Sequence, residues 1–175
     1  MATSFVHVGE HGFWSRDWIY ADWLLLLARE ADVRPSPLLE PFREQWRLDG
    51  LICSIGCVPG DFGPVASDPP TLDVVLQLAD TAQERLEALG DVLSASELDG
   101  LLDHSIDRLF ESGRHEPSTP DDVRKWVEWR RSVHGIELAV YANFYGLFRG
   151  LLTGRVKTTA ASPINYWKVL ERRDG

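Results

Sequence analysis

Apolar residues recur at helical spacing along most of the chain, and this pattern predicts a series of helices. The clearest period lies in residues 71–89, where apolar side chains share one side and Gly90 follows as a stop signal. In residues 18–28 apolar side chains cover nearly the whole circumference, with Asp22 as the exception, so we expect this helix to run through the middle of the core. Further helices are predicted over residues 41–50, 94–113, 119–135, 136–152 and 162–170.

Two segments depart from this pattern. Residues 5–8 are compatible with a short strand, and Ser15 is placed to cap the helix that follows, with Asp17 in its first turn. Residues 51–70 are rich in Gly and Pro and predict an irregular but ordered loop. Because six to seven helices with short connections can enclose one core, the sequence predicts an all-α, single-domain bundle over residues 1–175.

The composition and net charge argue against several classes of protein. The chain has 175 residues, a formal net charge of −9 at pH 7 and 10% aromatic residues, a content that excludes an intrinsically disordered chain. Phosphates would repel so acidic a protein, which argues against a dedicated binder of nucleic acid or of an anionic membrane. The sequence shows neither a signal-peptide pattern nor an apolar run long enough to span a bilayer, so we expect a cytoplasmic protein.

Metal and redox patterns are weak. Cys53 and Cys57 lie four residues apart, which is neither the C-x-x-C redox spacing nor half of a zinc site. We predict that both are reduced and buried. No spacing of the five histidines supports a metal site shared with them, so we expect neither a metal nor another cofactor.

Catalytic patterns are equally scarce. Asp103-His104-Ser105 places a base beside acids, but consecutive residues of a helix point in different directions and form no working triad by themselves. Asp22, inside an apolar helix, is a candidate functional carboxylate; the alternative is a structural carboxylate that is hydrogen-bonded in the core. A non-enzymatic protein is therefore the favoured interpretation.

Gly146, Gly150 and Gly154 follow one another at intervals of four residues. On a helix this spacing forms a flat stripe that permits close backbone approach, and in lipid it is a dimerisation signal. Because Asn143 and Arg149 interrupt the apolar segment, we expect tight packing against a neighbouring helix inside the domain instead.

The strongest signal is an uneven distribution of charge. Residues 61–120 contain 13 acidic residues and only three arginines. Within the two helices predicted there, carboxylates recur at intervals that place them on one face of each helix. Such a face usually keeps a protein soluble, whereas a functional face would steer a cationic partner. The carboxylates that we predict for partner binding are Asp73, Asp80, Glu84, Glu87, Asp99, Asp103 and Asp107.

Short motifs occur in the N-terminal half. They read H-G-F-W-x-x-D over residues 11–17, followed by a Leu-rich helix, then R-E-x-W over residues 43–46 and G-C-V over residues 56–58. In these motifs the chain resembles small acidic bacterial immunity proteins that are encoded beside polymorphic or contact-dependent toxins. The motif residues of the first segment are Gly12, Phe13, Trp14 and Asp17.

The resemblance implies a protein that binds one cognate toxin and masks its active site. Acidity fits this role, because nuclease toxins are basic where they bind phosphate. We therefore expect an immunity or antitoxin protein that binds a basic protein through its acidic helix faces. One alternative is a helical enzyme or small-ligand binder that uses Asp22 or His104 in a cleft. Another is a structural subunit whose aromatic segment, residues 141–148, packs against a second copy.

Overall fold

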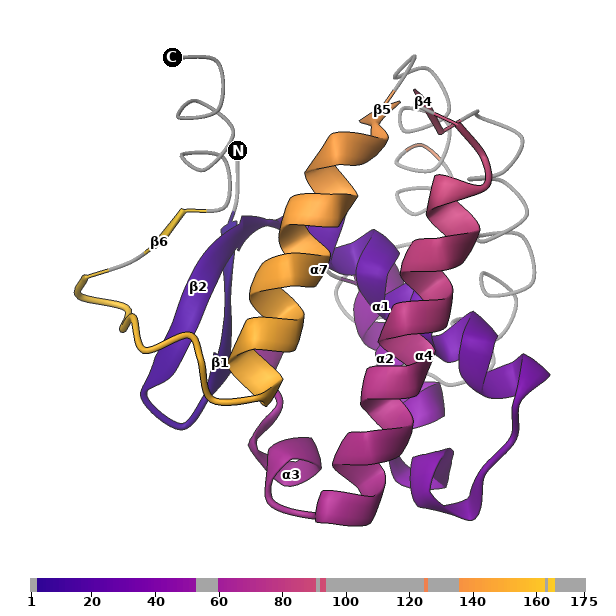
Figure 1. Ribbon diagram of the computed structural model, residues 1–175, viewed down its shortest axis with the longest axis horizontal. Coiled ribbons are helices and arrows are strands. Elements are labelled where there is room, and N and C mark those ends of the chain that lie inside the picture. The colour runs from indigo at the N-terminus through magenta and orange to yellow at the C-terminus, as the bar shows by residue number, and fades with distance from the viewer. Residues whose placement is uncertain are drawn as a thin grey trace.

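The computed structural model describes residues 3–52, 60–90, 92–93, 125, 136–162 and 164–165 (Figure 1). The elements in chain order are β1 (Thr3–Val8), β2 (His11–Arg16), α1 (Asp17–Val33), the 3-10 helix η1 (Pro37–Leu39), α2 (Glu40–Ile52), β3 (Gly60–Asp61), α3 (Gly63–Ala66), α4 (Pro69–Glu87), β4 (Val92–Leu93), β5 (Ile136–Glu137), α7 (Leu138–Leu152) and β6 (Ile164–Asn165).

The fold combines helices with sheets, so the prediction of an all-α bundle is wrong. β1 and β2 pair as an antiparallel hairpin at the centre of a four-stranded sheet with the order β3-β1-β2-β6. β3 runs parallel to β1, and β6 runs parallel to β2. A second sheet pairs β4 with β5 in antiparallel register. Strands of two residues carry almost no alternation of their own, which is why the hydrophobic pattern did not reveal them.

The hairpin corrects the predicted start of the first long helix. Ser15 belongs to β2 and its hydroxyl donates to the Arg16 carbonyl, so it does not cap α1, which begins at Asp17. Val8 pairs with His11, which leaves Gly9 and Glu10 as a two-residue loop. Gly9 has a φ of 58°, a conformation that a two-residue hairpin loop requires at its first position and that glycine adopts without strain.

The prediction that residues 18–28 run through the core is confirmed for nearly all of this segment. Every residue from 19 to 28 is buried, because α2, α4, α7 and the hairpin all contact α1. Trp23 lies at the centre, and its ring centroid is 5.4 Å from that of Phe144 and 5.7 Å from that of Phe148 on α7. An amphipathic stripe would not suffice for a helix that is enclosed on several sides.

The remaining helix predictions have mixed outcomes. α4 confirms the helix expected over residues 71–89 within two residues at each end. α2 continues through Gly50, and the segment 51–70 contains β3, α3 and the start of α4. β6 occupies part of the predicted terminal helix, so that prediction is wrong at residues 164–165. The helices predicted over 94–113 and 119–135 lie outside the described residues, apart from a helical residue 125.

Candidate interaction surface

α4 carries the predicted acidic face within the described part of the chain. Asp68 caps the helix by accepting a hydrogen bond from the Thr71 amide at 3.2 Å, and Pro69 and Pro70 fill the first turn. The apolar side of α4, which includes Val75 and Leu86, enters the core. The opposite side is exposed and presents Asp73, Gln77, Glu84 and Glu87.

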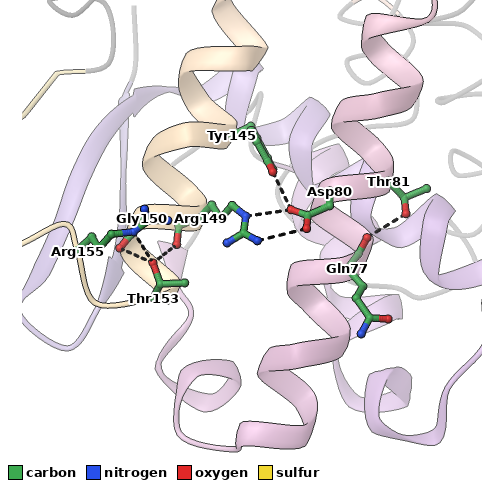
Figure 2. A network of polar contacts seen from close by, with 8 residues as sticks. All are labelled: Gln77, Asp80, Thr81, Tyr145, Arg149, Gly150, Thr153 and Arg155. Carbon is green, nitrogen blue, oxygen red and sulfur yellow. Dashed lines mark hydrogen bonds and ion pairs between the residues drawn. The ribbon is translucent and has the colours of Figure 1, made fainter.

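Asp80 differs from its acidic neighbours because it is engaged by α7. The Tyr145 hydroxyl donates to Asp80 Oδ1 at 2.7 Å, and Arg149 Nε donates to the same oxygen at 3.1 Å (Figure 2). Arg149 Nη2 reaches Oδ2 at 3.4 Å. These contacts fasten α7 to α4 and balance the charge of Asp80. Of the predicted partner-binding carboxylates on α4, Asp80 is therefore the one that forms an ion pair with another described residue.

The contacts around Asp80 also shift the pKa values of Tyr145 and Arg149. Partial burial raises the pKa of the Tyr145 phenol, and the hydrogen bond to Asp80 raises it further. The hydrogen bond to Tyr145 raises the pKa of Arg149, and Asp80 adds to that shift. Both shifts favour the state in which Tyr145 is neutral and Arg149 is charged.

The other edge of α4 contacts the C-terminal end of α1. Arg85 donates to the buried Glu30 carboxylate through Nε at 2.6 Å and through Nη2 at 3.2 Å, and this contact raises the pKa of Arg85. Arg34 Nη1 donates to the Thr81 hydroxyl at 2.9 Å. The acidic face of α4 is therefore bordered by α7 on one side and by the end of α1 on the other (Figure 1).

Sequence reasoning missed these long-range partners. Glu30 and Arg85 are 55 positions apart, and Asp80 and Arg149 are 69 positions apart, so no local spacing links them. One signal was present. Tyr145 and Arg149 are polar residues four positions apart on a mostly apolar helix, which is the spacing of a shared face turned toward a polar neighbour.

The other predicted sites have different locations. Asp22 is buried in the core and accepts a hydrogen bond from the Tyr141 hydroxyl at 2.6 Å, as expected for the structural alternative. His104, the two cysteines and the acidic residues Asp99, Asp103 and Asp107 lie outside the described residues. In the ranges that the structure describes, no group of three or more His, Cys, Asp or Glu side chains could hold a metal ion.

The N-terminal motif residues form structure rather than an exposed site. Gly12 lies opposite His7 in the hairpin, and a Cβ there would be 2.3 Å from the Val6 carbonyl oxygen. Phe13 is fully buried against Phe144 of α7, at a ring-centroid distance of 5.3 Å. Gly12 therefore permits close pairing within the hairpin, and Phe13 packs the hairpin onto α7.

Trp14 and Asp17 complete this arrangement. Trp14 is half-buried, and its ring centroid is 5.2 Å from that of Phe5 on β1. Asp17 is buried at the start of α1 and accepts a hydrogen bond from the Ser4 hydroxyl at 2.7 Å. Burial raises the pKa of Asp17 despite the opposing effect of that hydrogen bond. Asp17 thus joins α1 to β1 and is not exposed to a ligand.

The glycine series does not form the expected helix-packing stripe. A Cβ on Gly146 would meet no described atom within 4 Å. On Gly150 it would lie 3.2 Å from Val156 Cγ2, which belongs to the segment after α7 and not to a neighbouring helix. Gly154 follows the end of α7 with a φ of 70°. The series instead contains a helix terminus, because its last member adopts the left-handed conformation that ends many helices.

Comparison with protein-family models, with curated proteins and with solved structures found no match for this chain. In the described part of the chain, no helix is both long enough and apolar enough to cross a membrane.

Proposed function

We propose that this protein binds and neutralises a cationic protein partner, in the manner of an immunity protein or antitoxin, and that the exposed face of α4 is its docking surface. One observation carries the proposal. Asp73, Glu84 and Glu87 are exposed on one face, and among the described residues no arginine, lysine or histidine forms an ion pair with them. This part of the surface has charge available for a partner.

The physical role of such a face is to accelerate and select encounters. Carboxylates that are not neutralised within the protein produce a negative field that attracts a basic surface and repels an acidic one. The net charge of −9 reinforces that field over the whole molecule. A toxic partner inside the same cell would have to be bound quickly to cause no harm. We propose that this binding takes place in the cytoplasm.

Buried side chains disfavour the Asp22 form of the enzyme or ligand-binder alternative and the structural-subunit alternative, whereas His104 lies outside the described residues. An enzyme or ligand binder that uses Asp22 would need a carboxylate open to substrate, whereas Asp22 is only 1% exposed. A subunit that associates through residues 141–148 would need exposed aromatic side chains, whereas Tyr141, Phe144 and Phe148 are fully buried in the protein's own core. The fourth aromatic residue, Tyr145, is half-buried and donates its hydroxyl to Asp80. These observations leave the acidic face of α4 as the better-supported site.

In vivo cross-linking tests the proposal. A photo-cross-linking amino acid replaces Gln77, at the centre of the exposed face, in the cells from which the protein derives. The control carries the same amino acid at Glu10, which is exposed in the hairpin loop away from α4 (Figure 1). We expect one dominant adduct from position 77, with a protein of positive net charge, and no such adduct from position 10. Failure of position 77 to capture a protein, or capture of an acidic one, contradicts the proposal.

Association kinetics with the captured protein provide the second test. Glu84→Lys and Glu10→Lys change the net charge by the same amount, so they form a matched pair. Glu84→Lys is expected to slow association about threefold or more at low salt, and the difference should shrink as salt screens the field. Equal association rates for both variants would move the interface away from α4.

A further inference from the structure

Exposed apolar side chains cluster at the connection between α1 and η1. Among the described residues, three large hydrophobic side chains are exposed: Val33 at 60%, Leu38 at 39% and Leu89 at 39%. Two of them lie within residues 33–38, which we call the α1–η1 turn. Single exposed hydrophobic residues are ordinary, but this turn exposes Val33, Pro35, Pro37 and Leu38 within six positions.

The α1–η1 turn is held in one conformation by its neighbours. The Arg34 amide donates to the Glu30 carbonyl at 2.9 Å, and Ser36 caps η1 by accepting from the Leu38 amide at 3.4 Å. Leu39, directly after Leu38, is buried in the core. The two prolines fix their own φ angles as well. Val33 and Leu38 are therefore presented on a rigid support, and binding them would cost little conformational entropy.

The same turn adjoins the acidic face of α4. Arg34 donates to the Thr81 hydroxyl, and Thr81 lies on α4 between Gln77 and Glu84 in sequence. The Thr81 hydroxyl in turn donates to the Gln77 carbonyl at 2.9 Å (Figure 2). η1 also contacts α4 directly. The apolar turn and the acidic helix α4 therefore lie side by side, joined by the Arg34–Thr81 hydrogen bond.

We infer that the α1–η1 turn is the apolar anchor of the docking surface proposed above, and that its occupant is an apolar patch beside the basic surface of the same cationic protein. This inference rests on the proposed function. Interfaces commonly pair a desolvated apolar centre with a charged rim. The two parts have separate kinetic effects, because rim charges govern the association rate and anchor contacts govern the dissociation rate.

Dissociation kinetics test the anchor. The double variant Val33→Ser/Leu38→Ser is compared with the matched variant Leu89→Ser, using as probe the protein cross-linked at position 77. The double variant is expected to dissociate about tenfold faster or more, with an association rate within about twofold of wild type, whereas Leu89→Ser should leave both rates unchanged. Circular dichroism of all three proteins checks that the fold is retained. An unchanged dissociation rate in a folded double variant overturns the anchor.

The outcomes separate the anchor from the proposed function. If Glu84→Lys slows association while the double variant dissociates at the wild-type rate, the acidic face is retained as the docking surface and the anchor is wrong. If position 77 captures no protein, both fail together. A photo-cross-linker at Leu38 should capture the same protein as position 77, and a different protein there refutes the shared surface. If light scattering instead shows that wild type self-associates and the double variant does not, the occupant is a second copy and the inference is overturned.

Discussion

Gly50 and Gly146 allow one substitution, Gly→Ala, to be tested in two helices with opposite expected results. Both lie inside helices, α2 and α7, where alanine is intrinsically about 1 kcal/mol more favourable than glycine. Their surroundings differ. A Cβ on Gly50 would lie 2.8 Å from Leu25 Cγ and 2.9 Å from the Ala21 carbonyl oxygen, whereas a Cβ on Gly146 would meet no described atom within 4 Å.

These distances set the expected magnitudes. At Gly50 the helix backbones of α1 and α2 must separate, because one of the two close atoms is a main-chain oxygen that no rotamer change can move. Overpacking of this kind costs about 1–3 kcal/mol, which exceeds the gain in helix propensity. We therefore expect Gly50→Ala to lower the free energy of unfolding by about 1–2 kcal/mol. Gly146→Ala should raise it by about 0.5–1 kcal/mol, since the gain there has no opposing contact.

Urea denaturation followed by tryptophan fluorescence measures both values. The midpoint should shift in opposite directions in the two variants while the slope with denaturant stays that of wild type, so that the shift reports stability alone. Equal stability of Gly50→Ala and Gly146→Ala would contradict this expectation, because α1 and α2 would then not approach closely at Gly50. Destabilisation of both variants would also contradict it, because a contact at Gly146 would then exist.

Two further predictions concern buried carboxylates. Arg85→Met leaves Glu30, which is 0% exposed, in the core without its cation, so we expect a loss of about 2–4 kcal/mol in urea denaturation. An unchanged free energy of unfolding in this variant would argue against a buried charge. Asp17 has a pKa raised above its ordinary value of 3.8, so it contributes most to stability below that value and less as pH rises through the native pKa. The free energy of unfolding of Asp17→Asn relative to wild type should therefore increase from about pH 3 to about pH 6. A difference in unfolding free energy that does not change with pH contradicts this.

The sequence by itself located the three long helices α1, α4 and α7. The continuous apolar circumference of residues 18–28 identified a central helix, because a helix enclosed on all sides needs no polar face. The period of residues 71–89 and the apolar run of 136–152 likewise located α4 and α7 to within about two residues. In each case the information lies in neighbours three or four positions apart, which a single sequence contains.

The β1–β2 hairpin was indicated in part by local sequence signals, but strand pairing decided it. The alternation of residues 5–8, the Gly9-Glu10 pair and the following aromatic segment were all visible in the sequence, and together they indicate a two-residue turn between strands. The competing interpretation gave Ser15 to a helix cap, a role that a serine before an apolar helix often has. The pairing of Ser15 with Ser4 decided between the two, and pairing is a property of both strands.

Tertiary structure alone decided the sheet order and the fate of the predicted site residues. β3 and β6 have two residues each and exist because β1 and β2 offer them partners from distant segments. Asp73 and Asp80 looked equivalent as acids on one helix face, yet the approach of α7 leaves the first exposed and pairs the second with Arg149. Helix spacing fixes the direction in which a side chain points, but the charge that it meets there depends on which element packs beside it.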